Sequence, residues 1–176
     1  LAEVLTPEKT GKNCEKFEFF PVLIKFIDAK QNSSVQVHPS DDYALKYENS
    51  YGKTESWYIV EAEEGAGIYC GFKRDTNKEE FLQSLASGEV ENLLNFIPVK
   101  KGDCYFIPSG TVHAIGAGCL ILEIQQNSDL TYRVYDYNRR GADGKLRELH
   151  VDKAVKVINF NKYEPKLFAS GENPRV

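Results

Sequence analysis

The chain has 176 residues, of which 41% are hydrophobic and 27% are charged, and its formal net charge is −4. This length is enough for one domain with a hydrophobic core, and the composition is ordinary for a globular protein. The negative balance argues against a nucleic acid or an anionic membrane surface as the partner. We find neither an apolar run long enough to span a bilayer nor the basic region and cleavage site of a signal peptide.

The cysteines indicate the compartment. There are four of them, none forms a C-x-x-C pair, and two lie inside apolar runs typical of strands. This pattern predicts free buried thiols in a reducing compartment, and it argues against a disulfide framework or a thiolate zinc site. We therefore expect a cytoplasmic protein. The four residues are Cys14, Cys70, Cys104 and Cys119.

The first part of the chain is predicted to be mostly strands. Residues 1–16 are polar and are expected to be helical or irregular. Apolar runs or two-residue alternation predict strands at 17–29, 33–37, 55–62 and 66–73. In the third of these, Glu55, Trp57 and Ile59 should share one face, because successive side chains on a strand alternate. We assign four aromatic residues to the core rather than to a sugar-stacking surface: Trp57, Tyr58, Tyr105 and Phe106.

A helical insertion is predicted at about 77–95. Asn77 can cap the start of a helix, Glu80 stands three residues later as in a capping box, and Gly88 can end it. A second short turn follows, carrying Val90 and Leu93. The insertion separates the two groups of predicted strands.

The remaining elements complete a mainly β domain. Strands are predicted at 96–99, 104–107, 111–115, 119–125 and 130–135. A last amphipathic helix is expected to carry Val151, Ala154, Val155 and Ile158, and residues 161–176 are expected to form an extended tail. Short strands at regular spacing favour a β-sandwich or jelly roll, which we place at residues 17–160.

Two stretches, about seventy residues apart, carry the chemistry. In the first, Gln36 and His38 are two residues apart in a strand, so their side chains leave the same face. In the second, Gly102 and a Pro108-Ser109-Gly110 turn bracket an aromatic strand, and His113 begins the next strand. Two of the only three histidines therefore lie in bracketed motifs. Strands that aim these imidazoles at one interior point would make a metal site.

The second stretch resembles the second motif of the cupin superfamily, which forms double-stranded β-helix barrels. The spacing from Gly102 through Pro108 and Gly110 to His113 matches that motif. Three features depart from the usual cupin pattern. Ala117 stands where an asparagine is usual, Gln36 replaces one histidine of the first motif, and Glu55 is seventeen residues beyond His38.

These departures resemble one cupin family, the type I mannose-6-phosphate isomerases, in their short bacterial branch. Its Q-x-H-P-x-D-x-x-A segment is similar to the run from Gln36 to Ala44, and its K-x-E element to Lys53 and Glu55. Its P-x-x-T-x-H turn is similar to the run from Pro108 to His113. Its E-x-x-x-x-S-D-x-x-x-R element is matched by four residues: Glu123, Ser128, Asp129 and Arg133. Family members are longer, and the resemblance therefore leads us to expect that their N-terminal segment and second cupin-like domain have no counterpart in residues 1–176.

The resemblance implies a cupin-type jelly-roll barrel that holds one zinc ion. The implied ligands are Gln36, His38, Glu55 and His113. Two imidazoles and one carboxylate with an open position are a common catalytic zinc set. The implied reaction interconverts mannose 6-phosphate and fructose 6-phosphate through a metal-stabilised enediolate, with a small sugar phosphate as the partner. Arg133 is the implied catalytic arginine, and Lys53 and Asp129 are candidates for proton handling or substrate hydroxyl contacts.

Two other readings use the same residues. The first is an iron dioxygenase of the cupin type, although an amide ligand at Gln36 argues against it because oxygenases prefer imidazole and carboxylate around iron. The second is a non-catalytic sugar-binding cupin. Retention of Asp129 and Arg133 beside the ligand set argues against that reading. Other polar residues are expected to lie at the surface: His150 as a capping residue, and Arg139 and Arg140 as salt-bridge partners.

Overall fold

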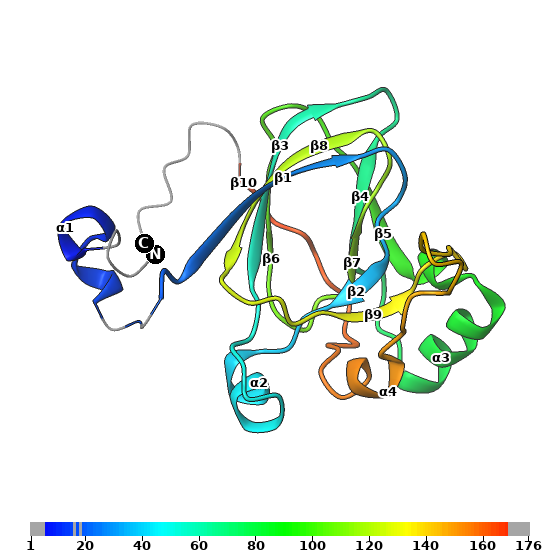
Figure 1. Cartoon of the computed structure of the whole chain (residues 1–176). Coiled ribbons are helices and arrows are strands. Elements are labelled where there is room, and N and C mark those ends of the chain that lie inside the picture. Colours follow the sequence, from blue (N-terminus) through cyan, green and yellow to red (C-terminus); the bar gives the residue numbers. More distant parts are fainter. Residues whose placement is uncertain (1–5, 16, 18, 169–176) are drawn as a thin grey trace.

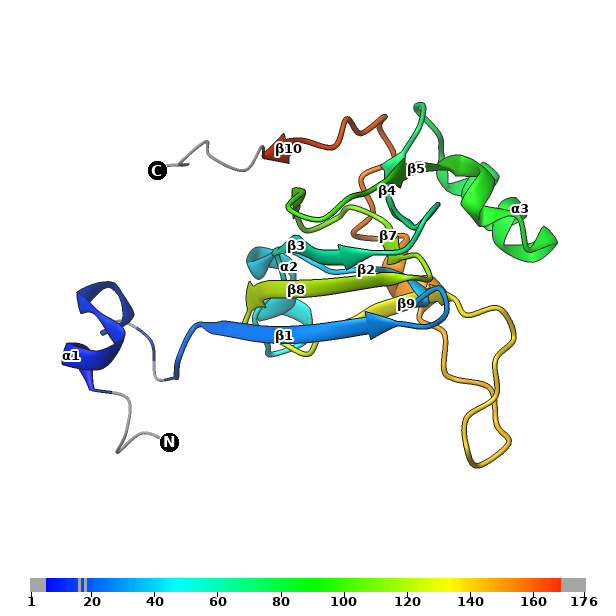
Figure 2. The same ribbon diagram turned by 90° about the horizontal axis from the view of Figure 1, so that it is seen from above.

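The protein is described by a computed structural model that covers residues 6–15, 17 and 19–168. Two antiparallel β-sheets face each other and enclose a barrel, which is seen almost end-on in Figure 1. Helices lie against the outside of one sheet and at the ends of strands, and Figure 2 shows this from above. The mainly β, cupin-type architecture that the sequence predicts is confirmed.

Each sheet has five strands within the described residues. In spatial order the first sheet consists of β1 (Val22–Ala29), β8 (Cys119–Gln126), β3 (Glu55–Ala62), β6 (Cys104–Ile107) and β10 (Leu167–Phe168). The second consists of β5 (Leu94–Pro98), β4 (Gly67–Phe72), β7 (His113–Ile115), β2 (Val35–Val37) and β9 (Tyr132–Tyr135). Most neighbouring strands are distant in sequence, so the order of the strands is set by long-range pairing.

The helices are short except for α3. At the N-terminal end, α1 (Pro7–Thr10) and η1 (Lys12–Cys14) lie beyond the start of β1, away from the sheets (Figures 1 and 2). The others are α2 (Asp41–Tyr47), α3 (Lys78–Ser87), η2 (Val90–Leu93) and α4 (Val151–Ala154). The last is shorter than predicted, although Ile158 in the turn that follows is buried as its apolar pattern requires.

The apolar core has two parts. One lies inside the barrel and includes Ile59, Ile68 and Ile121 together with Trp57 and Tyr105. The other lies outside the second sheet. It is formed by outward-facing residues such as Val35 and Val134 together with residues from α3, η2 and α4. Alternation along each strand separates these two sets, because neighbouring residues point to opposite faces. The first set therefore lines the barrel interior, and the second set packs between the second sheet and the helices.

Two sequence expectations differ from the structure in detail, the burial of two aromatic residues and the capping box of α3. Trp57 and Tyr105 are in the core. The next residue on each strand, Tyr58 or Phe106, points to the outer face, and these two side chains are 38% and 40% exposed. Asn77 caps α3 by accepting from the amide of Glu80 at 2.9 Å. The Glu80 carboxylate does not complete the capping box, since it accepts from Arg74 and Thr76 instead.

The cysteines and the membrane expectation can also be checked. All four thiols are free, and Cys70 and Cys119 are buried whereas Cys14 and Cys104 are partly exposed. Among the described residues, no helix combines the length and the apolar character that a membrane crossing requires. Part of the predicted tail is ordered as β10, which pairs with β6 through Leu167 and Tyr105.

Candidate metal centre

The two histidine motifs meet inside the barrel. Gln36 on β2 pairs directly with His113 on β7, and His113 pairs in turn with Cys70 on β4. On the other side, Gln36 pairs with Arg133 on β9. Directly paired residues on antiparallel strands point to the same face of a sheet. His38 shares that face because it is two residues after Gln36, so one row of side chains crosses the inner face of the second sheet.

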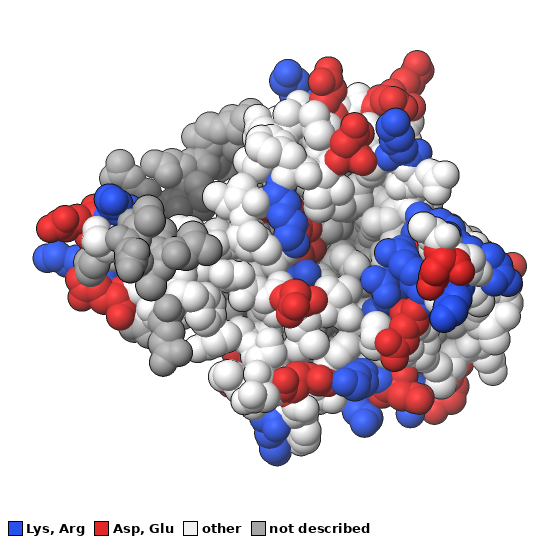
Figure 3. All heavy atoms as spheres, in the orientation of Figure 1, with Lys and Arg blue, Asp and Glu red and all other residues white. Residues whose placement is uncertain are grey.

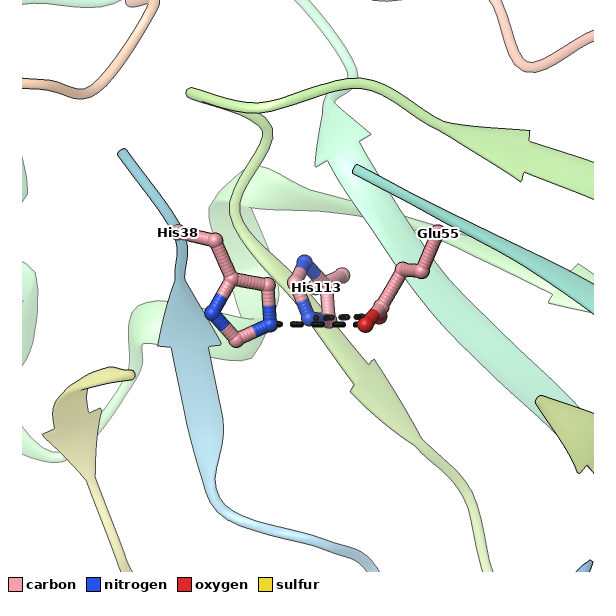
Figure 4. A group of neighbouring side chains, drawn as sticks. All are labelled: His38, Glu55 and His113. Carbon is pink, nitrogen blue, oxygen red and sulfur yellow. Dashed lines mark ion pairs between the residues drawn. The ribbon is translucent and has the colours of Figure 1, made fainter. Parts of the chain in front are cut away.

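The first sheet supplies a carboxylate to the same point. Glu55 begins β3 and faces His38 and His113 across the barrel, as Figure 4 shows. Its oxygens lie 3.5 Å from His38 Nε2 and 3.2 Å from His113 Nε2, and Gln36 Nε2 is 3.3 Å from His113 Nε2. One ligand atom from each of the two histidines and the glutamate lies within 4.8 Å of the others. The structure thus brings together all four residues predicted as ligands.

Backbone carbonyls fix the orientation of both imidazoles. Nδ1 of His38 is 3.0 Å from the carbonyl of Leu130, and Nδ1 of His113 is 2.9 Å from the carbonyl of Thr111. A carbonyl only accepts, so each Nδ1 carries the proton and donates it. Each Nε2 then carries a lone pair that points toward Glu55. Carbonyl partners of this kind orient metal-ligating histidines in many proteins.

The cluster contains buried acceptor atoms that no donor satisfies within the described residues. His38 Nε2 and both carboxylate oxygens of Glu55 are buried and have no hydrogen-bond partner among the described residues. Lone pairs of neutral imidazoles facing a carboxylate repel one another, and unpaired buried acceptors are costly. A divalent ion would satisfy all of them at once. Rotating the Gln36 amide by 180° would turn its oxygen toward the same point, where it could serve as a further ligand. The donor set therefore fits a metal ion.

Burial controls the protonation of the cluster. Desolvation raises the pKa of Glu55 to about 8, with the neighbouring charge of Glu123 adding to the effect. Desolvation also lowers the pKa of His113 to about 4 and holds that of His38 well below its usual value. At neutral pH and without metal, the carboxyl group is thus protonated and both imidazoles are neutral. A bound cation would favour the carboxylate form instead.

Metal binding at pH 7 is expected to release about one proton per chain, because only Glu55 must lose a proton to become a ligand. The affinity should rise with pH up to about 8 and then level, since above that pH the carboxyl group is already ionised. Titration calorimetry in two buffers of different ionisation enthalpy gives the proton count. Glu55→Gln should bind more weakly and release none. A proton count of zero for the unmutated chain at pH 7 would contradict this account.

A second polar row lies beside the metal centre. Glu123 is buried and accepts from Lys25 Nζ and from Trp57 Nε1, each at 3.0 Å. Lys25 also donates to Gln125, which pairs with Glu55 across β8 and β3. Sequence reasoning gave Lys25 no role. One sequence feature could have indicated a role. Lys25 is a single lysine on the inward-facing side of an apolar strand, where a buried charge without a partner would be costly.

The three residues predicted to be catalytic lie in different surroundings. Lys53 is buried in the loop just before β3, and desolvation lowers the pKa of its ammonium group. Arg133 is partly exposed on β9, where Nε donates to Ser34 Oγ at 3.3 Å and Nη1 to the Glu148 carbonyl at 3.0 Å. Asp129 is exposed on the turn before β9, near enough for its charge to affect Lys53. Their roles stay predictions.

Other motif residues build the frame of the site. The Asp41 carboxylate accepts from the amide of Gly52 at 2.8 Å and from the side chain of Gln126, so it ties the loop after His38 to the start of β3. Gly110 has a φ of +82° and donates to the His38 carbonyl at 2.8 Å. A Cβ there would come within 2.9 Å of the Val157 carbonyl, so only glycine fits this turn.

The residues expected at the surface are placed as follows. Arg139 forms an ion pair with Asp136, as predicted, and Arg147 pairs with the same carboxylate. Arg140 donates to the Gly144 carbonyl at 2.8 Å. His150 precedes α4 without capping it through its side chain, and its Nδ1 accepts from the amide of Arg133 at 3.3 Å. His150 therefore supports the strand that carries Arg133.

Comparison with known proteins identifies the relatives of this chain. The sequence is 54% identical over 140 residues to mannose-6-phosphate isomerase ManA of Bacillus subtilis, a match that covers 79% of this chain and 44% of the relative. It is 49% identical over 147 residues to mannose-6-phosphate isomerase of Streptococcus mutans, covering 84% of this chain and 46% of the relative. No family model matches the chain.

A solved structure agrees with these sequence matches. The crystal structure of mannose 6-phosphate isomerase from Bacillus subtilis superposes with a TM-score of 0.82 at 43% identity, covering 90% of this chain and 50% of that one. The chain thus spans about half the length, or slightly less, of the proteins it matches. It is a homologue of the mannose-6-phosphate isomerases, and its described residues form a barrel of the cupin type.

Proposed function

We propose that this chain forms the zinc-binding catalytic barrel of an aldose–ketose isomerase that interconverts mannose 6-phosphate and fructose 6-phosphate. The observation that carries the proposal is the buried group of His38, Glu55 and His113 in a chain whose relatives bear the name mannose-6-phosphate isomerase. Gln36 would complete the ligand set. Two imidazoles, a carboxylate and a neutral amide oxygen leave room in the coordination shell for substrate oxygens.

Zinc, when bound, supplies a Lewis acid that polarises a sugar carbonyl or hydroxyl oxygen. The protein residues around it have separate tasks. The isomerisation moves a proton between C1 and C2 of the open-chain sugar while negative charge develops on the neighbouring oxygen. Arg133 stays charged at any working pH, so it can offset that charge but is a poor proton acceptor. Lys53 and Asp129 remain the candidates for proton handling and for binding sugar hydroxyls.

Lys53 is suited to a task close to the reacting atoms. Burial lowers the pKa of its ammonium group, while the charges of Glu55 and Glu123 raise it again. A lysine in such a setting can exchange a proton more readily than an exposed one. Asp129 is exposed at the turn that precedes β9, which suits contact with a substrate hydroxyl better than general base catalysis in a buried site.

The substrate phosphate requires a cationic region, and the loop after β9 supplies one. Arg139, Arg140 and Arg147 line a cavity of about 240 Å³ beside this loop. Figure 3 shows Lys and Arg side chains gathered over the same loop. Asp136 offsets part of the charge of Arg139 and Arg147, whereas Arg140 forms no ion pair within the described residues and donates to the Gly144 carbonyl. We place the phosphate beside Arg140.

Replacing Arg140 by glutamine should raise the KM for the sugar phosphate on the order of fivefold, with kcat nearly unchanged. The lost contact is a charge-assisted hydrogen bond made equally in the ground state and the transition state. Steady-state kinetics at low salt will measure it. Arg74→Gln is the matched control, because Arg74 lies beside α3 and pairs with Glu80. An unchanged KM in Arg140→Gln would mean that the phosphate binds at another position.

A coupled assay of fructose 6-phosphate formation from mannose 6-phosphate tests the proposed function. The zinc-loaded chain should turn over, a chelator should stop it, and added zinc should restore it. Metal analysis of the purified protein reports which ion is carried. Oxygen uptake with iron would indicate a dioxygenase instead. Sugar-phosphate binding without turnover by the zinc-loaded chain would reduce the barrel to a binding module.

A further inference from the structure

The buried lysine of the site has an unusual partner. Lys53 is 5% exposed, yet none of the ion pairs among the described residues includes it. Its side-chain hydrogen bond goes to the hydroxyl of Thr131, with Nζ 3.3 Å from Oγ1. A long flexible side chain with a compact charge is free to adopt many rotamers unless a neighbour holds it. The threonine hydroxyl is that neighbour.

The orientation of the threonine hydroxyl is itself fixed. Its proton is donated to the carbonyl of Asp129 at 3.3 Å, so a lone pair is left to accept from Lys53. Valine has the same shape as threonine and can form neither of these hydrogen bonds. The hydroxyl therefore acts on Lys53 through hydrogen bonding and not through packing.

The turn that carries Thr131 is anchored by buried side chains. Gln125 is 2% exposed, and its Nε2 donates to the Ser128 carbonyl at 2.7 Å. The Ser128 hydroxyl donates to the Tyr51 carbonyl at 2.8 Å and accepts from the amide of Leu130 at 3.2 Å. These bonds join the end of β8 to the loop before β3. The turn consequently has a defined position relative to Lys53.

The same turn also reaches the metal centre. The carbonyl of Leu130 accepts from Nδ1 of His38, and the hydroxyl of Thr131, one residue later, accepts from Lys53. Two neighbouring residues thus orient one imidazole and one ammonium group. One short piece of backbone sets their relative placement, and it therefore fixes the position of the ammonium group relative to the cluster of His38, Glu55 and His113.

We propose that Thr131 is a positioning residue for the isomerisation, whose hydroxyl holds the Lys53 ammonium group at the substrate beside the metal centre. The inference rests on the proposed function, since it takes Lys53 to act on the sugar. It assigns the threonine no contact with substrate. Its effect should therefore appear in turnover and should vanish when Lys53 itself is removed.

Kinetics of three variants test the proposal in the zinc-loaded chain. Thr131→Val should lower kcat on the order of tenfold with a smaller change in KM, because a hydrogen bond to a charged group is lost. Thr131→Ser keeps the hydroxyl and should recover most of the rate. Thr54→Val is the matched control. Thr54 is adjacent to Lys53, and its hydroxyl makes no hydrogen bond with any described residue, so kcat should not change.

A double-mutant cycle separates positioning from a general structural effect. In a Lys53→Met background, Thr131→Val should cause no further loss of kcat, because the group it positions is gone. Equal losses in both backgrounds would overturn the proposal. A rate of Thr131→Val equal to that of the unmutated chain would do the same.

Crystal structures test the positioning of Lys53 independently of the proposed function. If the zinc-loaded chain shows no turnover, the proposed function fails, and the position of Lys53 in Thr131→Val then decides the structural claim. Displacement of Lys53 Nζ from its place beside the turn, with His38, Glu55 and His113 unmoved, supports the positioning role. An unmoved Lys53 in that variant overturns it.

Discussion

Replacement of His113 by alanine is expected to abolish metal binding and isomerase turnover together while the barrel stays folded. The imidazole supplies one of two nitrogen ligands, and its Nδ1 is already committed to the Thr111 carbonyl. Loss of a group that merely orients a ligand costs about 10–100-fold in metal affinity, so loss of a ligand should cost more. Metal content by elemental analysis and turnover in the coupled assay measure the effect.

Two further variants control for the cavity left by alanine and for the loss of a histidine outside the cluster. His113 packs edge-on against Trp57, with ring centroids 5.3 Å apart, so alanine also leaves a small cavity. His113→Gln fills more of that space and should also bind metal weakly. His150→Ala removes the third histidine, outside the cluster, and should keep its metal. Circular dichroism confirms folding. Full turnover by a metal-depleted His113 variant would refute the assignment of a catalytic metal.

Replacement of Arg133 by alanine should lower kcat and kcat/KM together, on the order of 10²–10³-fold, with metal content unchanged. This is the typical cost of losing one donor to a developing oxyanion, and a charge that acts mainly in the transition state affects both parameters alike. Arg133 pairs with Gln36 in the β2–β9 register, which puts the two side chains on the same inner face.

The conservative variant and a control make the Arg133 test specific. Arg133→Lys should recover only part of the rate, because a point ammonium cannot copy the planar fork that contacts Ser34 and the Glu148 carbonyl. Arg74→Ala should leave turnover unchanged, since that arginine pairs with Glu80 beside α3. If Arg133→Ala raises KM alone, the arginine only binds substrate, and the catalytic role passes to Lys53 or Asp129.

The local sequence determined the elements that form the site. Alternation along residues 55–62 predicted that Glu55, Trp57 and Ile59 share a face, and all three are buried inside the barrel. The cap at Asn77 and the end at Gly88 bounded α3 as predicted. Such features depend on neighbours only a few residues away, so a single sequence is sufficient to recognise them.

The histidine motifs also predicted which residues would converge, through their resemblance to a known family. The reason for that convergence is visible only in the fold. Gln36 meets His113 because β2 pairs with β7, seventy-seven residues further on, and Glu55 faces them from the other sheet. The proton on each Nδ1 depends on the carbonyls of Leu130 and Thr111, and backbone groups leave no mark in a sequence pattern.

The order of the strands decided which partners the other polar residues of the interior acquire. Lys25 lies in an apolar strand and acquires a role only because β1 pairs with β8, which brings Glu123 within 3.0 Å. The periodicity of one strand specifies the face on which a side chain lies, but not the strand that lies beside it. The sequence alone therefore determined the barrel type and the candidate ligands. The partners of Lys25, Lys53 and Arg133 were decided by pairing between segments far apart in the chain, because contacts of that kind form only when the two sheets close.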